Sequence, residues 1–236
     1  MLQPRACDLT EADRADIIRH SEIGPRLTEP LLTRLADAAT ALDVRRRRFI
    51  YRAGDAPDWL YLIARGRVKL CYFEADTDRE AVIDILPVGS LFGEFALYGT
   101  GLRQMCAVAY EQVRLLRVPV GEFRQAMGES RELYDYTFRL VGQRLSRRER
   151  RIADFALDPI PARLEKLLLD LSERYGRPAA EGVLIDLTLP HREIASIVGS
   201  TRESVTMRLN DMRRAGMIEF VDRKILLKYL PAPAPA

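Results

Sequence analysis

One short segment places a guanidinium and a carboxylate next to each other at the start of a predicted helix. Arg202 could donate two hydrogen bonds to O6 and N7 of a guanine, and Glu203 could accept one from the amino group of a cytosine. At about 100° per residue, later positions continue the same helical face. The residues predicted to lie on or beside this face are Ser200, Thr201, Arg202, Glu203, Thr206, Met207 and Asn210. This chemistry suits the edges of bases in a DNA major groove.

Two short helices joined by a tight turn would position that face. The stretch 192–198 carries apolar residues at helical spacing, and Gly199 follows it where a sharp stop requires positive φ. Ser200 and Glu203 have the spacing of a capping box, so a second helix can begin at once. Its apolar positions, which would hold it to a core, are Val205, Leu209 and Met212.

A β-hairpin is predicted behind the second helix. Gly216 would end the helix, and two strands, 217–221 and 224–229, would turn at Asp222 and Arg223. This turn would lay Arg223 and Lys224 beside phosphates. An alternative stays open, because helix-turn-helix geometry also occurs as a packing motif, with Glu203 serving only as a cap.

A second segment, GSLFGEFALYGTGLRQMCAVA, has the chemistry to hold an anion. Glu94 could accept from a sugar hydroxyl, and Arg103 could hold a phosphate bidentately. Phe95 and Ala96 after Gly93 could open a short helix with free backbone N–H groups. The alternative is a surface salt bridge between Glu94 and Arg103 beside an ordinary turn.

This second segment lies in a region with the pattern of a β-roll or sandwich. Between residues 44 and 118, short alternating runs are separated by glycine and proline. An apolar helical stripe precedes this region at 29–40, and one or two helical turns follow it at 120–127.

A heptad stripe indicates a long helix over residues 131–157 that pairs with its twin in a homodimer. The predicted interface residues are Tyr134, Phe138, Val141, Leu145, Ile152 and Phe155. Arg148 interrupts this stripe with a charge, which would snorkel outward, pair with Glu149 or meet an anion. The alternative is a single helix packed on its own domain.

Composition bounds the class of protein. The chain has 236 residues, a net charge of +3 and a composition typical of soluble globular proteins. It lacks a long apolar run and a secretory leader, so we expect a cytoplasmic protein with no membrane contact. The three cysteines are widely spaced and predict neither a disulfide framework nor a metal site. Cys106 lies near Arg103, which could favour its thiolate, although a strand-core cysteine is the expected role.

The order of these parts resembles the CRP/FNR superfamily over nearly the whole chain. The resemblance rests on FGEFALYGTGLR, on a long helix ending FALD, and on EIASIVGSTRESVTMRL. It implies an α+β fold with three parts: an N-terminal cyclic-nucleotide-binding-like β-roll (a double-stranded jelly roll) with flanking helices at 1–130, a dimerisation helix at 131–158, and a C-terminal winged helix-turn-helix at 159–236.

The resemblance also implies site residues and partners. Gly93, Glu94 and Arg103 match the cassette of the cyclic-AMP-binding members, but Gln104 replaces a small hydroxyl residue, and Arg147 and Arg148 replace a Thr-Ser pair. Met207 stands where many members have an arginine that reads a base. The implied partners are double-stranded DNA with a two-fold site, a second copy of the chain, and RNA polymerase. Haem and an iron-sulfur cluster are not expected, since the cysteines do not cluster and the only histidines are His20 and His191.

We therefore expect a non-enzymatic, homodimeric transcriptional regulator. An anionic, nucleotide-like effector other than cyclic AMP would bind at Gly93, Glu94 and Arg103, with Arg147 or Arg148 closing on it. Two alternatives remain open: a constitutive regulator with a vestigial cassette, and a ligand-binding module that acts on a partner protein. We find no nucleophile, metal-ligand or P-loop pattern that would indicate an enzyme.

Overall fold

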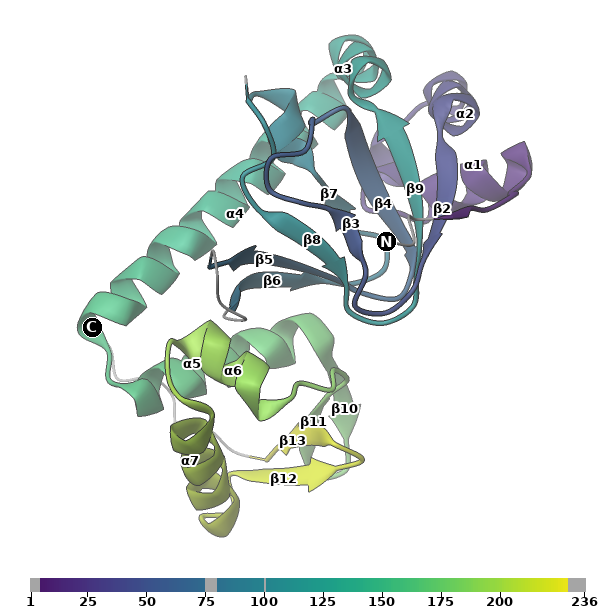
Figure 1. Cartoon of the computed structure of the whole chain (residues 1–236). Helices are drawn as coiled ribbons and strands as arrows, with labels where there is room; N and C mark the ends of the chain where they lie inside the picture. The colour runs from purple at the N-terminus through teal and green to yellow at the C-terminus, as the bar shows by residue number, and fades with distance from the viewer. Residues whose placement is uncertain (1–4, 75–79, 100, 229–236) are drawn as a thin grey trace. The chain divides into compact units, whose positions relative to one another are not determined.

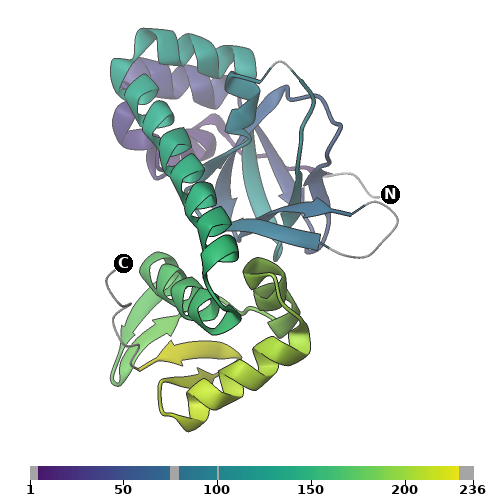
Figure 2. The ribbon, with the colours of Figure 1, turned by 90° about the vertical axis from the view of Figure 1, so that its left-hand side faces the viewer.

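The computed structural model describes residues 5–74, 80–99 and 101–228. The chain divides into two compact units, Met1–Ser146 and Arg147–Ala236, and the division falls inside one long helix, α4 (Arg131–Leu157). Helix α4 has 27 residues, as the heptad pattern predicts, and it is drawn as a single unbroken helix in Figures 1 and 2. Among the described residues, no helix combines the length and apolar character needed to cross a membrane.

Two antiparallel sheets form the β-roll of the first unit (Figure 1). The first sheet has the order β1-β2-β9-β4-β7, with strands β1 (Arg5–Ala6), β2 (Thr40–Val44), β9 (Val113–Pro119), β4 (Trp59–Arg65) and β7 (Leu91–Phe92). The second has the order β3-β8-β5-β6, with strands β3 (Phe49–Tyr51), β8 (Cys106–Ala109), β5 (Val68–Phe73) and β6 (Glu80–Leu86). The predicted α+β fold with an N-terminal β-roll is confirmed.

The first sheet is buried on both faces. Side chains alternate along β4, so that Tyr61 and Ile63 enter the interior of the roll, while Leu60 and Leu62 pack against helices on the outside. Those helices are α1 (Glu11–Arg19), η1 (Gly24–Arg26), α2 (Glu29–Ala38), α3 (Val120–Glu129) and the first half of α4. The predicted apolar stripe on α2 is confirmed, since its leucines are buried in this outer core.

The second unit combines the end of α4 with three helices and a four-stranded sheet. The helices are α5 (Ile160–Tyr175), α6 (His191–Val198) and α7 (Arg202–Arg214). The sheet has the order β10-β11-β13-β12, with strands β10 (Gly176–Ala179), β11 (Gly182–Ile185), β13 (Lys224–Leu227) and β12 (Ile218–Val221). The predicted hairpin of β12 and β13 turns at residues 222 and 223, and Tyr229 of the predicted second strand lies outside the described residues. Sequence reasoning missed β10 and β11, which double the width of this sheet.

Candidate effector and DNA-binding sites

Gly93 fixes the backbone of the predicted effector segment. Its φ is 82°, in the left-handed region that favours glycine, and a Cβ there would lie 3.0 Å from Nη1 of Arg103 and 3.2 Å from the Trp59 carbonyl oxygen. The predicted short helix is a single 3₁₀ turn, η2 (Glu94–Leu97), whose Ala96 N–H donates to the Gly93 carbonyl. The turn therefore presents fewer free N–H groups than the expected helix end.

Arg103 is buried and directs its guanidinium to the backbone. Nη1 donates to the Gly93 carbonyl at 3.0 Å, and Nη2 donates to the carbonyl of Trp59. The guanidinium carbon lies 4.4 Å from the ring centroid of Tyr51, at cation–π distance. Nε of Arg103 is buried and has no hydrogen-bond partner within the described ranges. The proposed anion-binding group is thus held mainly by carbonyls and a ring.

Glu94 pairs with a residue that sequence reasoning did not single out, Arg144 of α4. Arg144 Nη1 lies 2.7 Å from Oε2 of Glu94, and Nη2 donates to the Leu91 carbonyl at 2.7 Å. The two residues are only 6% and 9% exposed. Burial works to lower the pKa of Arg144, but the charge and hydrogen bond of Glu94 outweigh it, so the pKa is raised. The salt bridge between Glu94 and Arg103 that the sequence left open is therefore not formed.

A second stripe on α4, formed by its buried residues, places Arg144 beside Glu94. Leu133, Thr137, Leu140 and Arg144 follow each other at spacings of 4, 3 and 4 and are the buried residues of the helix. This stripe packs against the first unit, in which Leu133 and Leu140 belong to the outer core. Its periodicity is visible in the sequence and was the signal that could have identified Arg144.

Aromatic rings occupy the interior of the roll beside Arg103. Tyr51, Tyr61 and Phe92 are buried, and the rings of Tyr61 and Phe92 stack with centroids 5.0 Å apart. Burial is the largest cause of the raised pKa of Tyr51. Of the other predicted effector residues, Ala96 is buried, whereas Phe95 and Gln104 are exposed. Arg147 and Arg148 are half-buried at the start of the second unit, and their role stays a prediction.

The predicted dimer stripe is the exposed apolar face of α4. Phe138 is 72% exposed and Ile152 is 68% exposed, and the other members with large exposed side chains are Tyr134, Leu145 and Phe155. Val141 is half-buried. The first half of α4 thus has one face buried in the first unit, and the helix has another apolar face that remains largely exposed.

Helix α6 and helix α7 form the predicted helix-turn-helix. Gly199 has a φ of 64° and donates its N–H to the Ala195 carbonyl, and Val205, Leu209 and Met212 are the buried residues of α7. The helix begins one residue later than predicted, because the side chain of Thr201, rather than Ser200, accepts from the backbone N–H of Ser204 at 3.2 Å. The Ser200–Glu203 capping box is therefore wrong, and Glu203 is free of that role.

The start of α7 presents the predicted base-reading residues to solvent. Thr201, Arg202, Glu203 and Met207 are exposed, and Met207 is 55% exposed. Ser200, Thr206 and Asn210 are half-buried. The exposed group thus combines a guanidinium, a carboxylate and an apolar side chain within two turns.

Thr206 has a structural partner from the first helix. Nδ1 of His191 lies 2.8 Å from the Thr206 hydroxyl oxygen, and that hydroxyl donates to the Arg202 carbonyl at 2.8 Å. Since the hydroxyl hydrogen is used, Nδ1 of His191 must carry the hydrogen of this bond. Burial and then the charge of Arg202 lower the pKa of His191. The bond fixes α7 against α6.

Of the two predicted phosphate contacts in the β12–β13 hairpin, Arg223 and Lys224, only Arg223 has a side chain suited to that role. Asp222 and Arg223 have φ of 48° and 65°, as a two-residue hairpin turn requires, and Arg223 is exposed. Nζ of Lys224 instead lies 2.6 Å from Oδ1 of Asp186, which also pairs with Arg177. Lys224 is therefore already partly neutralised.

Phe155, predicted at the dimer interface, also touches the helix-turn-helix. A Cβ on Gly199 would lie 2.8 Å from Cε1 of Phe155, and the guanidinium carbon of Arg163 lies 5.1 Å from the centroid of the same ring. The end of α4 is thus packed directly on the turn between α6 and α7.

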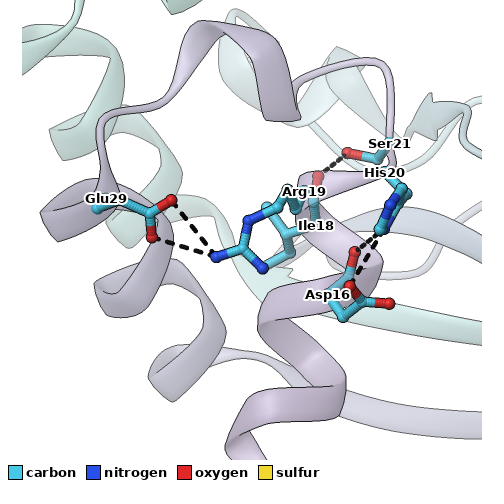
Figure 3. Close-up of polar contacts among 6 residues, drawn as sticks. All are labelled: Asp16, Ile18, Arg19, His20, Ser21 and Glu29. Atoms are coloured by element: carbon cyan, nitrogen blue, oxygen red, sulfur yellow. Dashed lines mark hydrogen bonds and ion pairs between the residues drawn. The ribbon is translucent and has the colours of Figure 1, made fainter.

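The N-terminal histidine has structural contacts. Figure 3 shows the ring of His20 turned toward Asp16, with Nδ1 2.9 Å from the Asp16 carbonyl oxygen, while Arg19 reaches Glu29 of α2 at 3.1 Å. In the ranges that the structure describes, no three His, Cys, Asp or Glu side chains gather as metal ligands.

Two family models match the chain in the regions described above. The cyclic nucleotide-binding domain matches residues 42–130, and the Crp-like helix-turn-helix domain matches residues 162–232. The global nitrogen regulator of Nostoc sp. is 35% identical over 76% of this chain and 81% of its own length. The CRP-like cAMP-activated global transcriptional regulator of Mycobacterium tuberculosis is 28% identical over 79% of this chain and 83% of its own length.

A solved structure has the same fold at lower identity. The c-di-GMP responsive regulator CLP of Xanthomonas campestris superposes with a TM-score of 0.72 at 21% identity, covering 86% of this chain and 100% of that one. Together with the cassette and the helix-turn-helix, these matches establish that the chain belongs to the CRP/FNR superfamily of transcription regulators, which are not enzymes.

Proposed function

We propose that the chain acts as a homodimer that binds a two-fold symmetric DNA site, with α7 of each subunit in a major groove. The observation that carries this proposal is the exposed start of α7, where Arg202 and Glu203 are held on a helix whose opposite face is buried. Arg223 at the hairpin turn would contact phosphate, and RNA polymerase would be the partner on DNA.

The DNA proposal is tested by selecting bound sequences from random duplexes and measuring affinity for the selected site. Arg202→Ala should weaken binding by about 5- to 150-fold and relax the preference at one base pair of each half-site. Arg208→Ala is the matched control, because this exposed arginine of the same helix lies off the predicted reading face. Arg208→Ala should lose less affinity for DNA than Arg202→Ala, and its loss should be the same for every DNA sequence. Equal loss of preference in both variants would contradict base reading by Arg202.

Dimerisation is supported by the exposed stripe on α4. Burying a large apolar side chain contributes about 1.5–3 kcal/mol, so leaving Phe138 and Ile152 in water is costly. Phe138→Glu should therefore produce monomers in sedimentation experiments. Gln143→Glu, which adds the same carboxylate at another exposed position of α4, should leave the dimer intact. A dimer unaffected by Phe138→Glu would place the interface elsewhere.

For the effector, we propose an anionic small molecule, nucleotide-like but distinct from cyclic AMP, at the Gly93–Arg103 segment. Two buried guanidinium groups lie at this site, that of Arg103 in the segment itself and that of Arg144, which pairs with the carboxylate of Glu94. The buried Nε of Arg103 offers a donor that an anion would use. Arg147 and Arg148 remain candidates to close on such a ligand from α4.

A specific observation also favours an effector-independent regulator. Glu94 is already paired with Arg144, and two nitrogens of Arg103 already donate to carbonyls, so binding a cyclic nucleotide would require these contacts to be exchanged. Calorimetry with a panel of cyclic mono- and dinucleotides separates the two candidates. A heat of binding that the wild-type protein shows and Arg103→Leu lacks would support a regulator that binds an effector. No heat of binding with any ligand, combined with tight DNA binding, would support the constitutive regulator.

A further inference from the structure

Two of the three cysteines face each other across neighbouring strands of the second sheet. In the antiparallel pair β5–β8, Cys71 is the register partner of Cys106. Both are thiols, 0% and 6% exposed, and they share a small buried cluster with Val108, against which Phe49 packs. The two cysteines are distant in the sequence, and only the strand pairing brings them together.

The pairing places both side chains on one face of the sheet. Their neighbours Leu70 and Ala107 point into the interior of the roll, so the two thiols lie on its opposite, outer face. Directly opposed residues in antiparallel strands have Cα atoms about 4.5–5.5 Å apart. That range lies within the roughly 4.4–6.8 Å that a disulfide spans.

The backbone at this position is already irregular. The register of β5 with β6 shifts between Leu70 and Cys71, as at a β-bulge. Opposed Cβ atoms in a regular sheet are about 4.5–5.5 Å apart, slightly more than the roughly 3.5–4.5 Å of a disulfide. A bulge bends and twists its strand, so the distance between opposed Cβ atoms at Cys71 can depart from the regular value.

We propose that Cys71 and Cys106 are a modification site, a dithiol pair that oxidises reversibly to an intrachain disulfide. With a hydroperoxide as oxidant, one thiolate attacks the peroxide oxygen to give a sulfenic acid and releases the alcohol or water. The second thiol attacks that sulfur, forms the S–S bond and releases water. Two thiols are thereby oxidised by two electrons and the peroxide O–O bond is reduced. A small dithiol such as dithiothreitol reverses the step by exchange.

The disulfide would act on the segment that carries Arg103. The backbone N–H of Ala53 donates to Sγ of Cys106 at 3.4 Å. Next to it, Gly54 N–H donates to the Arg103 carbonyl at 2.8 Å, and Arg103 N–H donates to the Asp55 carbonyl at 2.9 Å. Drawing Cys106 toward Cys71 withdraws its sulfur from Ala53 at the edge of this ladder. The oxidised chain therefore differs from the reduced one in how firmly Arg103 is held.

The test treats the reduced full-length protein with hydrogen peroxide and measures its mass under non-denaturing and then denaturing conditions. We expect the loss of two hydrogen atoms, full reversal by dithiothreitol, and a non-reduced proteolytic peptide pair joining the segments around residues 71 and 106. Cys7→Ser, which removes the third cysteine, should leave the peptide pair unchanged. Wild-type protein that gains oxygen atoms at Cys106 without losing the hydrogen pair would overturn the proposal.

A second measurement on the wild-type protein tests the proposal independently of variants of the buried cysteines. Phenylarsine oxide bridges two neighbouring thiols, so the reduced wild-type protein should bind one equivalent that protects both Cys71 and Cys106 from alkylation. Cys71→Ala and Cys106→Ala should each abolish the disulfide while keeping the circular dichroism spectrum of the folded protein. If either variant fails to fold, the experiment with phenylarsine oxide on the wild-type protein decides. Alkylation of both Cys71 and Cys106 in the presence of phenylarsine oxide would refute the proposed pair.

Discussion

Breaking the buried pair of Arg144 and Glu94 should cost far more stability than breaking an ordinary surface ion pair. Arg144→Met keeps an unbranched side chain of similar length but leaves the Glu94 carboxylate buried without its cation. Breaking a buried pair in this way costs about 3–5 kcal/mol, because the remaining charge is uncompensated. The lost hydrogen bond to the Leu91 carbonyl adds to this cost.

A double-mutant cycle isolates the interaction from these side effects. Glu94→Gln and the double variant complete the cycle. The free energy of unfolding lost in the double variant should be smaller, by about 1–3 kcal/mol, than the sum of the losses in the two single variants. The control is Arg131→Met on the same helix, whose side chain is 93% exposed and pairs with Asp135 at 3.7 Å. That variant should lose no more than about 1 kcal/mol.

Urea unfolding at pH 7 and fixed protein concentration provides the assay. The single tryptophan, Trp59, lies in β4 of the first unit, so its fluorescence reports the unit that contains Glu94. Additive losses around the cycle, or a loss for Arg144→Met as small as that of the control, would refute a strong interaction between Arg144 and Glu94.

Three further predictions concern the helix-turn-helix. Because burial lowers the pKa of folded His191, the free energy of unfolding should fall as pH drops below about 6.5, and His191→Asn, whose amide can still donate to Thr206, should flatten this dependence. An unchanged pH profile in urea titrations would exclude His191 as its source. Gly199→Ala should cost at least about 1–2 kcal/mol, since φ is 64° there and the new methyl group meets an aromatic ring; a neutral result in thermal unfolding would contradict the packing. Thr201→Ala should cost about 0.5–2 kcal/mol and Ser200→Ala less, and the reverse order would restore Ser200 as the cap.

Elements with strong periodicity could be predicted from sequence alone. The 3.6-residue pattern identified α2 and the core face of α7, the heptad stripe identified α4, and the positive-φ glycine marked the turn before α7. These features depend on residues that are neighbours in sequence, so local spacing suffices to find them. The family resemblance added the order of the parts, which periodicity alone does not supply.

The site was harder to predict because its partners are far apart in the chain. Nothing near Glu94 in sequence indicates Arg144, and nothing near Lys224 indicates Asp186. The cap was misplaced for a different reason. Ser200 N–H donates back to the Ala195 carbonyl, so this residue completes the turn of α6 instead of starting α7. Capping-box spacing could not distinguish these two roles.

The two faces of α4 have a mechanical consequence. The last residue of the helix, Leu157, lies thirteen positions after Arg144, a span of about 20 Å at 1.5 Å per residue. A tilt of about 10° pivoting on Arg144 would move that end by about 3.4 Å, the rise between successive nucleotides of one DNA strand. The aromatic ring of Phe155 near this end rests on the turn before α7, so we expect any such displacement of the end of α4 to be passed directly to that turn.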